Sequence, residues 1–365
     1  MILKQIELNN FRLCENAVID FCDGVNLIYG KNASGKTNVL EAIYFFARGK
    51  SFRGGKDADI TRFFEKGYSM KIVFDDKYGE NILEYRYYDG QRLRFVNGAK
   101  VTIKELIGKF NAVFFCPDHL SIIKASPSER REFLNIAISQ LYSEYVLLLS
   151  DHKKLTEGKN LLLKSEDEYD VNLMASYNEK LAEINAKIYL FRNEYSKKLS
   201  ASLKNIIKEI SFGKEEAKIY YKSDIVSEKT RFDEVKIEYE RLLKENEKRE
   251  RAAKMSLIGI HRDDLIFTIN NNDSKQFASQ GQQRSLALAL KLSEGEIIAN
   301  EKGDFPVYLF DDVLGELDED RKKYVLSKTE GRQMIVTACE KGDYINLNDL
   351  NMIYADNGKY EKKGH

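Results

Sequence analysis

Short apolar runs separated by turn residues occupy the first 115 positions of the chain, a pattern typical of strands and short helices. Residues 37–49 (TNVLEAIYFFARG) predict a helix that ends at Gly49. Apolar runs bounded by turn signals predict strands at residues 25–30, at 69–76, at 81–100, where two strands turn at Asp89-Gly90, and at 112–117, where Pro117 stops the run.

The middle of the chain has a different period. Apolar residues recur there at spacings of three or four: Leu181, Ile184, Ile188, Phe191, Tyr195, Leu199, Leu203, Ile206 and Ile210, then Phe232, Val235, Tyr239 and Leu242. In a background rich in Lys and Glu, this spacing predicts amphipathic helices. We expect these helices to pack on one another, which is a commoner use of such a stripe than a groove for a partner.

Strand patterns return near residue 255, at 257–269, 305–312 and 332–338. Strand-rich ends around a helical middle predict one α/β domain, a mixed sheet with helices, that is assembled from both termini and carries a helical insertion. We place the N-terminal part of this domain at 1–118, the insertion at 119–252 and the C-terminal part at 253–365. The last residues, 359–365 (KYEKKGH), are predicted to be frayed.

Composition limits the function classes. The 365 residues include 58 Lys and Arg against 58 Asp and Glu, so only a local patch, and not the net charge, can attract nucleic acid. The four cysteines form no C-x-x-C pair, which argues against a zinc site or a disulfide framework. The start lacks the apolar stretch of a signal peptide and no run is long enough to span a membrane, so we expect a cytoplasmic protein with no membrane partner.

The clearest chemical motif is GKNASGKT at residues 30–37, which fits G-x-x-x-x-G-K-[ST] between a predicted strand and a predicted helix. The glycines let successive backbone N–H groups point into one concavity that holds phosphate. Lys36 is expected to reach the β- and γ-phosphates of a nucleotide, and Thr37 to offer its hydroxyl to Mg²⁺. The alternative is a Gly-rich turn with an unrelated lysine, and the flanking strand and helix argue against it. The expected nucleotide-binding residues are Gly30, Lys31, Asn32, Ala33, Ser34, Gly35, Lys36, Thr37 and Asn38.

A carboxylate for the metal is found in VYLFDD, residues 307–312. A buried strand delivers Asp311 to its carboxyl end, where ligands gather in α/β sheets, and there we expect it to hold Mg²⁺ through water. Asp312 is placed to orient or deprotonate the attacking water. Alone, an Asp-Asp pair after a strand is as readily a turn signal, but beside a phosphate loop the functional interpretation is favoured.

A second helix N-terminus with free N–H groups follows the turn in ASQGQQRSLALALKL, residues 278–292. This stretch is similar to the signature Leu-Ser-Gly-Gly-Gln-Gln-Arg of the ABC-type ATPases. The resemblance implies that the turn contacts, in trans, the γ-phosphate held by a partner subunit, so that an ATP-dependent homodimer completes the site. It also implies a dimer-contact loop at GELD and a γ-phosphate sensor directly after RQMIV, residues 332–336. The implied residues are Ser279, Gln280, Gly281 and Gln282 in the signature, Gly315 and Asp318 in the loop, and Thr337 as the sensor.

Within this superfamily the chain most resembles the RecF family of bacterial gap-repair ATPases, which is related to the SMC proteins. The resemblance covers nearly the whole chain, and its more specific motifs are SPSERREFLN at 126–135 and HRDD at 261–264. It implies an ABC-type P-loop ATPase head with a short helical arm, ATP and Mg²⁺ as cofactors, and slow, DNA-stimulated ATP hydrolysis with Asp312 and Lys36 as catalytic residues. Arg12 is implied as a nucleotide contact. The implied partners are double-stranded DNA, gapped DNA junctions, RecR and RecO, in a nucleoid-associated setting.

Several positions depart from the family pattern. Ala33 replaces a glycine, Ile260 replaces a proline before HRDD, Gly315 replaces a serine, and the PDHL stretch has no Gln. None of these changes removes a phosphate or metal ligand. The alternative functions are an SMC-like structural ATPase, for which the insertion is too short to form a long coiled coil, and a transporter ATPase subunit, in which the phosphate loop and signature lie much closer together.

DNA contacts are predicted at two basic stretches. The first is residues 48–56 (RGKSFRGGK), which carry no acid. The second is the pair Arg130 and Arg131, which follows a Pro-Ser helix start. Solvated loops are an equally good interpretation of either stretch. His261 and Arg262 either link the phosphate site to the insertion or belong to an internal salt-bridge cluster. The DNA-contact candidates are Arg48, Lys50, Arg53, Lys56, Arg130 and Arg131.

Overall fold

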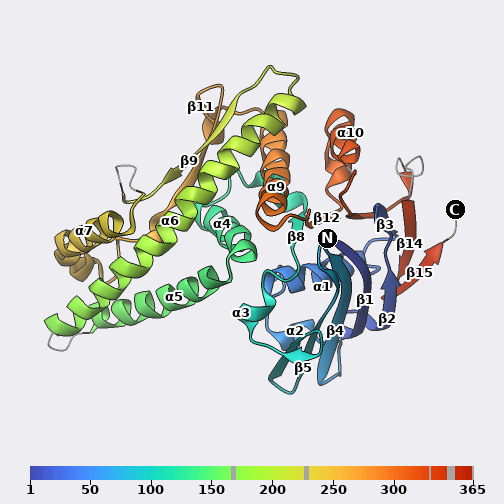
Figure 1. Ribbon diagram of the computed structural model, residues 1–365, viewed down its shortest axis with the longest axis horizontal. Helices are drawn as coiled ribbons and strands as arrows, with labels where there is room; N and C mark the ends of the chain where they lie inside the picture. Colours follow the sequence, from blue (N-terminus) through green and yellow to red (C-terminus); the bar gives the residue numbers. More distant parts are fainter. Residues whose placement is uncertain (166–169, 226–229, 329, 343–349, 364–365) are drawn as a thin grey trace. The chain divides into compact units, whose positions relative to one another are not determined.

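The computed structural model describes residues 1–165, 170–225, 230–328, 330–342 and 350–363. The chain forms two compact units (Figure 1). Unit 1 is an α/β domain built from both ends of the chain, and contains Met1–Ser121, Asn205–Lys214 and Ser279–His365. Unit 2 contains Ile122–Lys204 and Glu215–Ala278. None of the helices in the described ranges is long and apolar enough to cross a membrane.

Unit 1 contains a six-stranded, mostly parallel sheet in the order β15-β14-β3-β13-β12-β8. Its strands are β3 (Val25–Tyr29), β8 (Ala112–Phe115), β12 (Val307–Asp311), β13 (Met334–Ala338), β14 (Leu350–Asp356) and β15 (Lys359–Lys363). Every residue of β3, β8 and β12 is buried, as expected for parallel strands that are covered on both faces. The strands predicted at 25–30, 112–117, 305–312 and 332–338 are therefore confirmed.

A second, antiparallel sheet of unit 1 has the order β2-β1-β4-β5-β6-β7. Its strands are β1 (Ile2–Phe11), β2 (Cys14–Asp20), β4 (Gly67–Asp76), β5 (Gly79–Tyr88), β6 (Gln91–Val96) and β7 (Ala99–Lys100). The predicted turn at Asp89-Gly90 joins β5 to β6, and both residues have positive φ, 44° and 82°. This is the combination that a tight type I′ hairpin requires.

Helix α1 (Lys36–Arg48) contacts strands of both sheets, namely β1 of one and β8, β12 and β13 of the other. Eleven of its 13 residues are buried, which explains why its sequence is apolar on all sides. The helix ends at Gly49, as predicted, and this glycine has the left-handed conformation. The other helices of unit 1 are α2 (Asp57–Ile60), α3 (Ile103–Leu106), α9 (Gln280–Lys302), α10 (Glu319–Ser327) and the 3-10 turns η1 (Pro117–Ser121) and η3 (Leu314–Glu316).

The prediction of a frayed C-terminal tail is wrong for its described residues. Lys359–Lys363 forms β15, which pairs with β14 from Asp356↔Lys359 to Met352↔Lys363. The strand reads as a tail because its side chains are almost all exposed and charged. Lysines are common on such edge strands because they prevent pairing with another chain.

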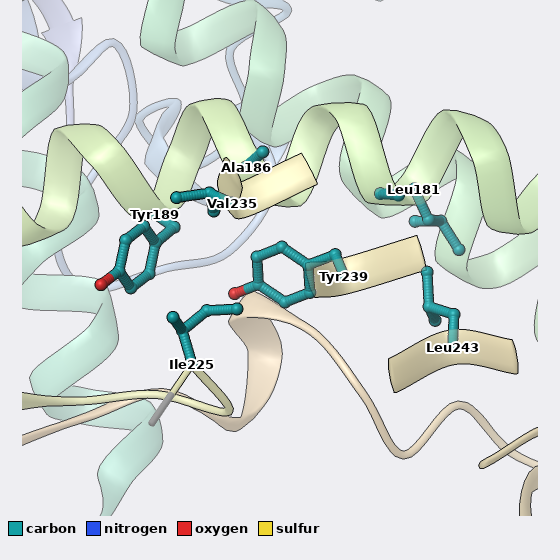
Figure 2. Close-up of a cluster of buried hydrophobic side chains, with 8 residues drawn as sticks. Leu181, Ala186, Tyr189, Ile225, Val235, Tyr239 and Leu243 are labelled. Carbon is teal, nitrogen blue, oxygen red and sulfur yellow. The ribbon is translucent and has the colours of Figure 1, made fainter. Parts of the chain in front are cut away.

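Unit 2 is mainly helical, with α4 (Pro127–Leu141), α5 (Ser143–Lys164), α6 (Val171–Ile210) and α7 (Phe232–Ala253). The predicted stripe of α7 packs against α6 in a buried cluster, in which Val235 and Tyr239 lie with Leu181 of the first predicted stripe (Figure 2). Tyr189 of α6 also belongs to this cluster, although the predicted stripe did not include it. The predicted packing of the helices on one another is confirmed. The last residues of α6 belong to unit 1, where Glu209 accepts a hydrogen bond from the Tyr324 hydroxyl at 2.7 Å.

Unit 2 also contains a three-stranded antiparallel sheet, β11-β10-β9, formed by β9 (Ala217–Lys222), β10 (Asp264–Ile269) and β11 (Asn272–Asp273) and followed by α8 (Ser274–Phe277). The strand predicted at 257–269 begins only at Asp264, because Ile260–Arg262 form the 3-10 turn η2. Pairing of β10 with β9 also places residues 253–278 in unit 2, whereas the sequence assigned them to the α/β domain.

Candidate nucleotide-binding site

The predicted phosphate loop forms a tight turn between β3 and α1. Gly35 precedes the helix with a φ of 104°, and Ala33 also has a positive φ, 62°, which fits the glycine that the family pattern has there. A Cβ atom on Gly30 would lie 2.2 Å from the carbonyl oxygen of Ala355, so only glycine fits. The loop is thus shaped partly by β14.

Lys36 is almost fully buried inside this loop. Its Nζ donates to the carbonyl oxygens of Gly30 at 2.7 Å and Lys31 at 3.1 Å. The ammonium group is therefore held where the backbone curls, which is the position a phosphate-binding lysine needs.

Asp311, the last residue of β12, and Asp312, which follows it, lie beside the end of this loop. Thr37 Oγ1 donates to Asp311 Oδ1 at 2.8 Å, and Thr337 Oγ1 donates to the same oxygen at 2.9 Å. Thr337 is the register partner of Asp311 on β13, and its hydroxyl accepts the backbone N–H of Asp312 at 2.9 Å. Burial raises the pKa of the Asp311 carboxyl, and hydrogen bonds from the two threonines oppose that rise. Thr337 thus supports both acids from a buried position.

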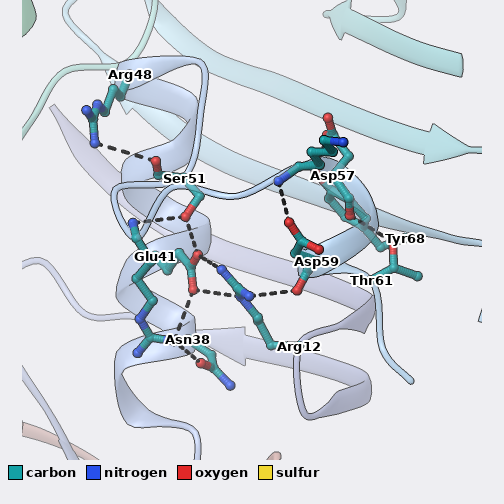
Figure 3. A network of polar contacts seen from close by, with 11 residues as sticks. Arg12, Asn38, Glu41, Arg48, Ser51, Asp57, Asp59, Thr61 and Tyr68 are labelled. Carbon is teal, nitrogen blue, oxygen red and sulfur yellow. Dashed lines mark hydrogen bonds and ion pairs between the residues drawn. The ribbon is translucent and has the colours of Figure 1, made fainter. Parts of the chain in front are cut away.

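Glu41, a fully buried acid on α1, is the centre of a network that the sequence did not indicate (Figure 3). Arg12 donates to its two oxygens at 2.6 and 3.1 Å, and Ser51 donates at 2.5 Å. Arg53 donates to Glu41 at 3.3 Å and to Asn38 Oδ1 at 2.9 Å. An acid inside the apolar run of residues 39–47 could have pointed to this network, because a buried charge needs partners.

A cavity of about 750 Å³ opens at the phosphate loop. Residues 32–38 and Asp312 form one part of its lining, and Arg12, Leu13, Arg53 and residues 61–65 form the rest, with Ala58 and Asp59. Phe63 and Phe64 in the latter segment are almost fully exposed. No motif in the sequence selects this aromatic pair, because its partners in the cavity come from other segments.

The C-terminal strands also support the loop. The Tyr360 hydroxyl donates to the carbonyl oxygen of Gly35 at 3.0 Å, and the Gly358 N–H donates to that of Ser34 at 3.0 Å. Sequence reasoning missed both residues because they lie more than 300 positions away in the chain.

Comparison with known proteins identifies this arrangement. The RecF/RecN/SMC N-terminal domain family matches residues 2–362. The DNA replication and repair protein RecF of Caldanaerobacter subterraneus subsp. tengcongensis is 39% identical over 94% of this chain and 95% of its own. That of Clostridium tetani is 36% identical over 98% and 99%. The chain belongs to the RecF family.

Solved structures agree with this assignment. The recombination mediator protein RecF-ATPrS in the RecFOR pathway matches with a TM-score of 0.93 at 36% identity, over 99% of this chain and 98% of that one. An SMC head bound to the winged-helix domain of ScpA has a TM-score of 0.57 at 18% identity, so it shares the fold alone. The chain is therefore an ABC-type ATPase of the RecF family, concerned with DNA replication and repair, and this function is favoured over the SMC-like alternative.

The signature-like turn begins α9 in this RecF-family chain. Ser279 Oγ accepts the Gln282 N–H at 3.2 Å, and Gln282 Oε1 accepts the Ser279 N–H at 2.9 Å. The two side chains thus form a reciprocal cap. Gln280 is exposed and Gly281 is partly exposed, and none of these four described residues lines the nucleotide cavity of its own subunit.

The GELD loop lies next to this turn. Asp318 begins α10 and accepts the Arg321 N–H at 3.0 Å. A Cβ on Gly315 would meet no atom of the described residues within 4 Å, so a serine would fit there. Arg321 Nη2 donates to the Gly281 carbonyl oxygen at 2.8 Å, and Arg284 Nη1 donates to that of Glu316 at 2.6 Å. Two arginines therefore connect the loop to the signature turn.

The basic stretch at 48–56 is divided between two environments. Arg53 reaches Asn38 and Glu41 and lines the nucleotide cavity. Arg48 is partly buried and donates to the Ser51 carbonyl oxygen at 3.5 Å, whereas Lys50 and Lys56 are exposed and lie outside the cavity lining. The two lysines therefore stay the candidates for a DNA contact in this stretch.

The prediction that Arg130 contacts DNA is corrected. Arg130 is 2% exposed and donates to both oxygens of Asp264, at 2.7 and 2.8 Å. Arg131 donates to the Asp263 carbonyl oxygen at 2.8 Å. Asp263 itself pairs with the buried Arg192 at 2.6 Å, and burial raises the pKa of Asp263 to about 6 although Arg192 opposes the rise. The salt-bridge interpretation of HRDD therefore fits its two acids, which hold unit 2 together.

Proposed function

We propose that this chain is an ATP-controlled DNA-binding protein of recombinational gap repair, in which two subunits close on DNA with ATP between them and open after hydrolysis. The observation that carries the nucleotide site is the 2.8 Å hydrogen bond from Thr37 to Asp311, which brings together the end of the phosphate loop and the end of β12. The signature turn lies outside the cavity of its own subunit, which supports completion of the site in trans. ATP then favours the closed dimer because only that state has all the γ-phosphate contacts.

Thr37 and Asp311 fit a Mg²⁺ ion, since hydroxyl and carboxylate oxygens are the ligands it prefers and these two already lie together. These two residues would hold the ion, with Asp311 acting through water as expected from the sequence. When bound, Mg²⁺ neutralises charge on the β- and γ-phosphates. Thr337 keeps the Asp311 carboxylate in position through its own hydrogen bond.

The remaining roles follow from the lining of the cavity. Lys36 exchanges its two carbonyl partners for phosphate oxygens, and Asp312 orients or deprotonates the attacking water. Arg12 and the exposed pair Phe63 and Phe64 form the part where the nucleoside lies, with an aromatic face available to the base. In this scheme, hydrolysis is slow and DNA-stimulated, because its role is to open the clamp and not to turn over a metabolite.

The proposed partners are double-stranded DNA, gapped junctions, RecO and RecR. The support comes from the relatives, which are DNA replication and repair proteins, and from the solved RecF structures, which belong to the RecFOR pathway. Unit 2 acts as the short arm of the clamp in this proposal.

The decisive experiment measures fluorescence anisotropy of a labelled gapped duplex at fixed salt, with ATP or ADP. Asp312→Asn is used to slow hydrolysis, and Lys36→Met serves as the variant that cannot hold the γ-phosphate. We expect the Asp312→Asn protein to bind with ATP and to release with ADP, and Lys36→Met to bind with neither. Equal binding in ATP and ADP, or none in either, would contradict the switch even if ATP hydrolysis were intact.

A further inference from the structure

A second cavity, of about 580 Å³, lies within unit 2 between α6 and β9. The two elements are joined by the Ile219 N–H, which donates to Ser200 Oγ at 2.9 Å. Three lysines line the cavity, Lys197 and Lys204 on α6 and Lys218 on β9, and none of its lining residues in the described part of the chain is acidic. Its size is within the range of ligand sites, roughly 300–1,000 Å³.

Two of the three lysines share one acidic partner. Glu216 lies at 3.0 Å from Lys204 and 3.6 Å from Lys218, so one carboxylate faces two ammonium groups. Since all three side chains are substantially exposed, the pairs are weak and can be exchanged for other anions. The cavity therefore attracts negatively charged groups.

One buried hydroxyl indicates what kind of anion fits. Ser196 lines the cavity, is only 2% exposed, and its Oγ has no hydrogen-bond partner among the described residues. A buried polar group without a partner costs free energy. A ligand that accepts a hydrogen bond from the hydroxyl would recover this free energy. Asn193 and Tyr220 line the same cavity and supply further donors. Hydroxyl, amide and lysine donors together are the usual partners of phosphate oxygens in nucleic acids.

We propose that this cavity binds phosphate groups of a nucleic-acid backbone. Lys197 and Lys204 are seven residues apart on α6, which is about 10 Å along the helix axis, or about three base-pair steps of duplex DNA at 3.4 Å each. One free phosphate cannot span that distance, whereas a strand presents several. The contact is sequence-independent because it reaches no base edge. The inference rests on the proposed function and adds a DNA contact on unit 2.

The test compares two double variants in the anisotropy assay, over a range of salt concentrations and with two unrelated gapped duplexes. Lys204→Gln with Lys218→Gln removes charge from the cavity. Lys153→Gln with Lys154→Gln removes the same charge from exposed positions on α5 of the same unit. We expect the cavity variant to bind both duplexes about tenfold more weakly and to lower the salt slope by about 2, roughly one for each lysine that no longer binds a phosphate. The α5 variant should match the wild type.

Further arms separate the possible failures. If the wild-type protein shows no ATP-dependent DNA binding, the proposed function fails first. If the wild type binds and the cavity variant keeps its affinity and salt slope, the cavity proposal is overturned. It is also overturned if the variant keeps its DNA affinity and loses only the binding of inorganic phosphate, or only the binding of a protein partner. Ser196→Ala, which does not perturb the packing by added volume, should weaken DNA binding about threefold and covers the case in which the double variant fails to fold.

Discussion

Among single residues, Thr337 positions both acids of the proposed ATPase site. Its buried hydroxyl donates to Asp311 and accepts the N–H of Asp312, each at 2.9 Å. Thr337→Val keeps the shape of the side chain and removes both bonds, so we expect kcat for ATP hydrolysis to fall about 10- to 100-fold, as for other supports of metal ligands. KM should change much less. Thr337→Ser should restore most of the rate, whereas a fully active valine variant would show that the residue only fills space.

The residues that sequence reasoning found and those it missed differ in where their partners lie. Gly30, Lys36 and Thr37 belong to one continuous motif whose geometry is local, so the spacing alone indicated their roles. Glu41 and Arg130 are different, because each is defined by partners elsewhere in the chain. Arg130 reads as a surface charge until Asp264, 134 positions away, is brought beside it.

At the scale of elements, α9 and α10 are joined where the proposed dimer contacts begin. Arg321 on α10 donates to Gly281 at the start of α9, to Ser285 Oγ at 2.9 Å, and pairs with Asp318. Arg321 therefore links the signature turn to Asp318 of the GELD loop. This connection is a consequence of the fold, since Gly281 and Arg321 are 40 positions apart.

Arg321→Gln should uncouple these two segments. We expect the ATP-dependent dimer to weaken about tenfold, comparable to the loss of one charged hydrogen bond, while ATP binding to the monomer is unchanged because Arg321 does not line the cavity. Sedimentation with ATP measures the first quantity and equilibrium ATP binding the second. Lys323→Gln, an exposed change on the same helix, is the control. Equal dimerisation of both variants would exclude the coupling.

The elements themselves were predictable where their patterns are strong. Buried parallel strands and amphipathic helices have distinct periods, so β3, β12 and the stripe of α6 were recognised from sequence. The hairpin of β14 and β15 was not recognised. β15 is an exposed edge strand of charged residues and resembles a tail, whereas β14 is a buried apolar strand that the sequence analysis did not single out. Yet this hairpin supports the phosphate loop, because Tyr360 and Gly358 donate hydrogen bonds to loop carbonyl groups. Part of the support for the site therefore comes from a segment that the sequence did not indicate.

At the scale of the whole molecule, both units keep histidines uncharged. Burial lowers the pKa of His152 to about 3 and lowers the pKa of His261, both in unit 2. In unit 1, burial lowers the pKa of His119 well below its ordinary value, and the nearby Lys291 adds to that effect. Below about pH 6.5 these rings are protonated in the unfolded chain but not in the folded chain. Folding therefore releases protons at such pH values.

This linkage predicts that the histidine contribution to the free energy of unfolding decreases from pH 7.5 to pH 5. The histidine contribution is complete above pH 6.5 and is lost as the pH falls, by up to about 1.4 kcal/mol per pH unit for each proton. Asp263, Asp311 and Glu294 act in the opposite direction, because burial raises the pKa of each carboxyl and a raised pKa favours the folded state at low pH. Urea unfolding at a series of pH values measures the slope, and His152→Gln should make it shallower. An equal slope in the wild type and in His152→Gln would mean that the His152 ring is protonated in the folded protein.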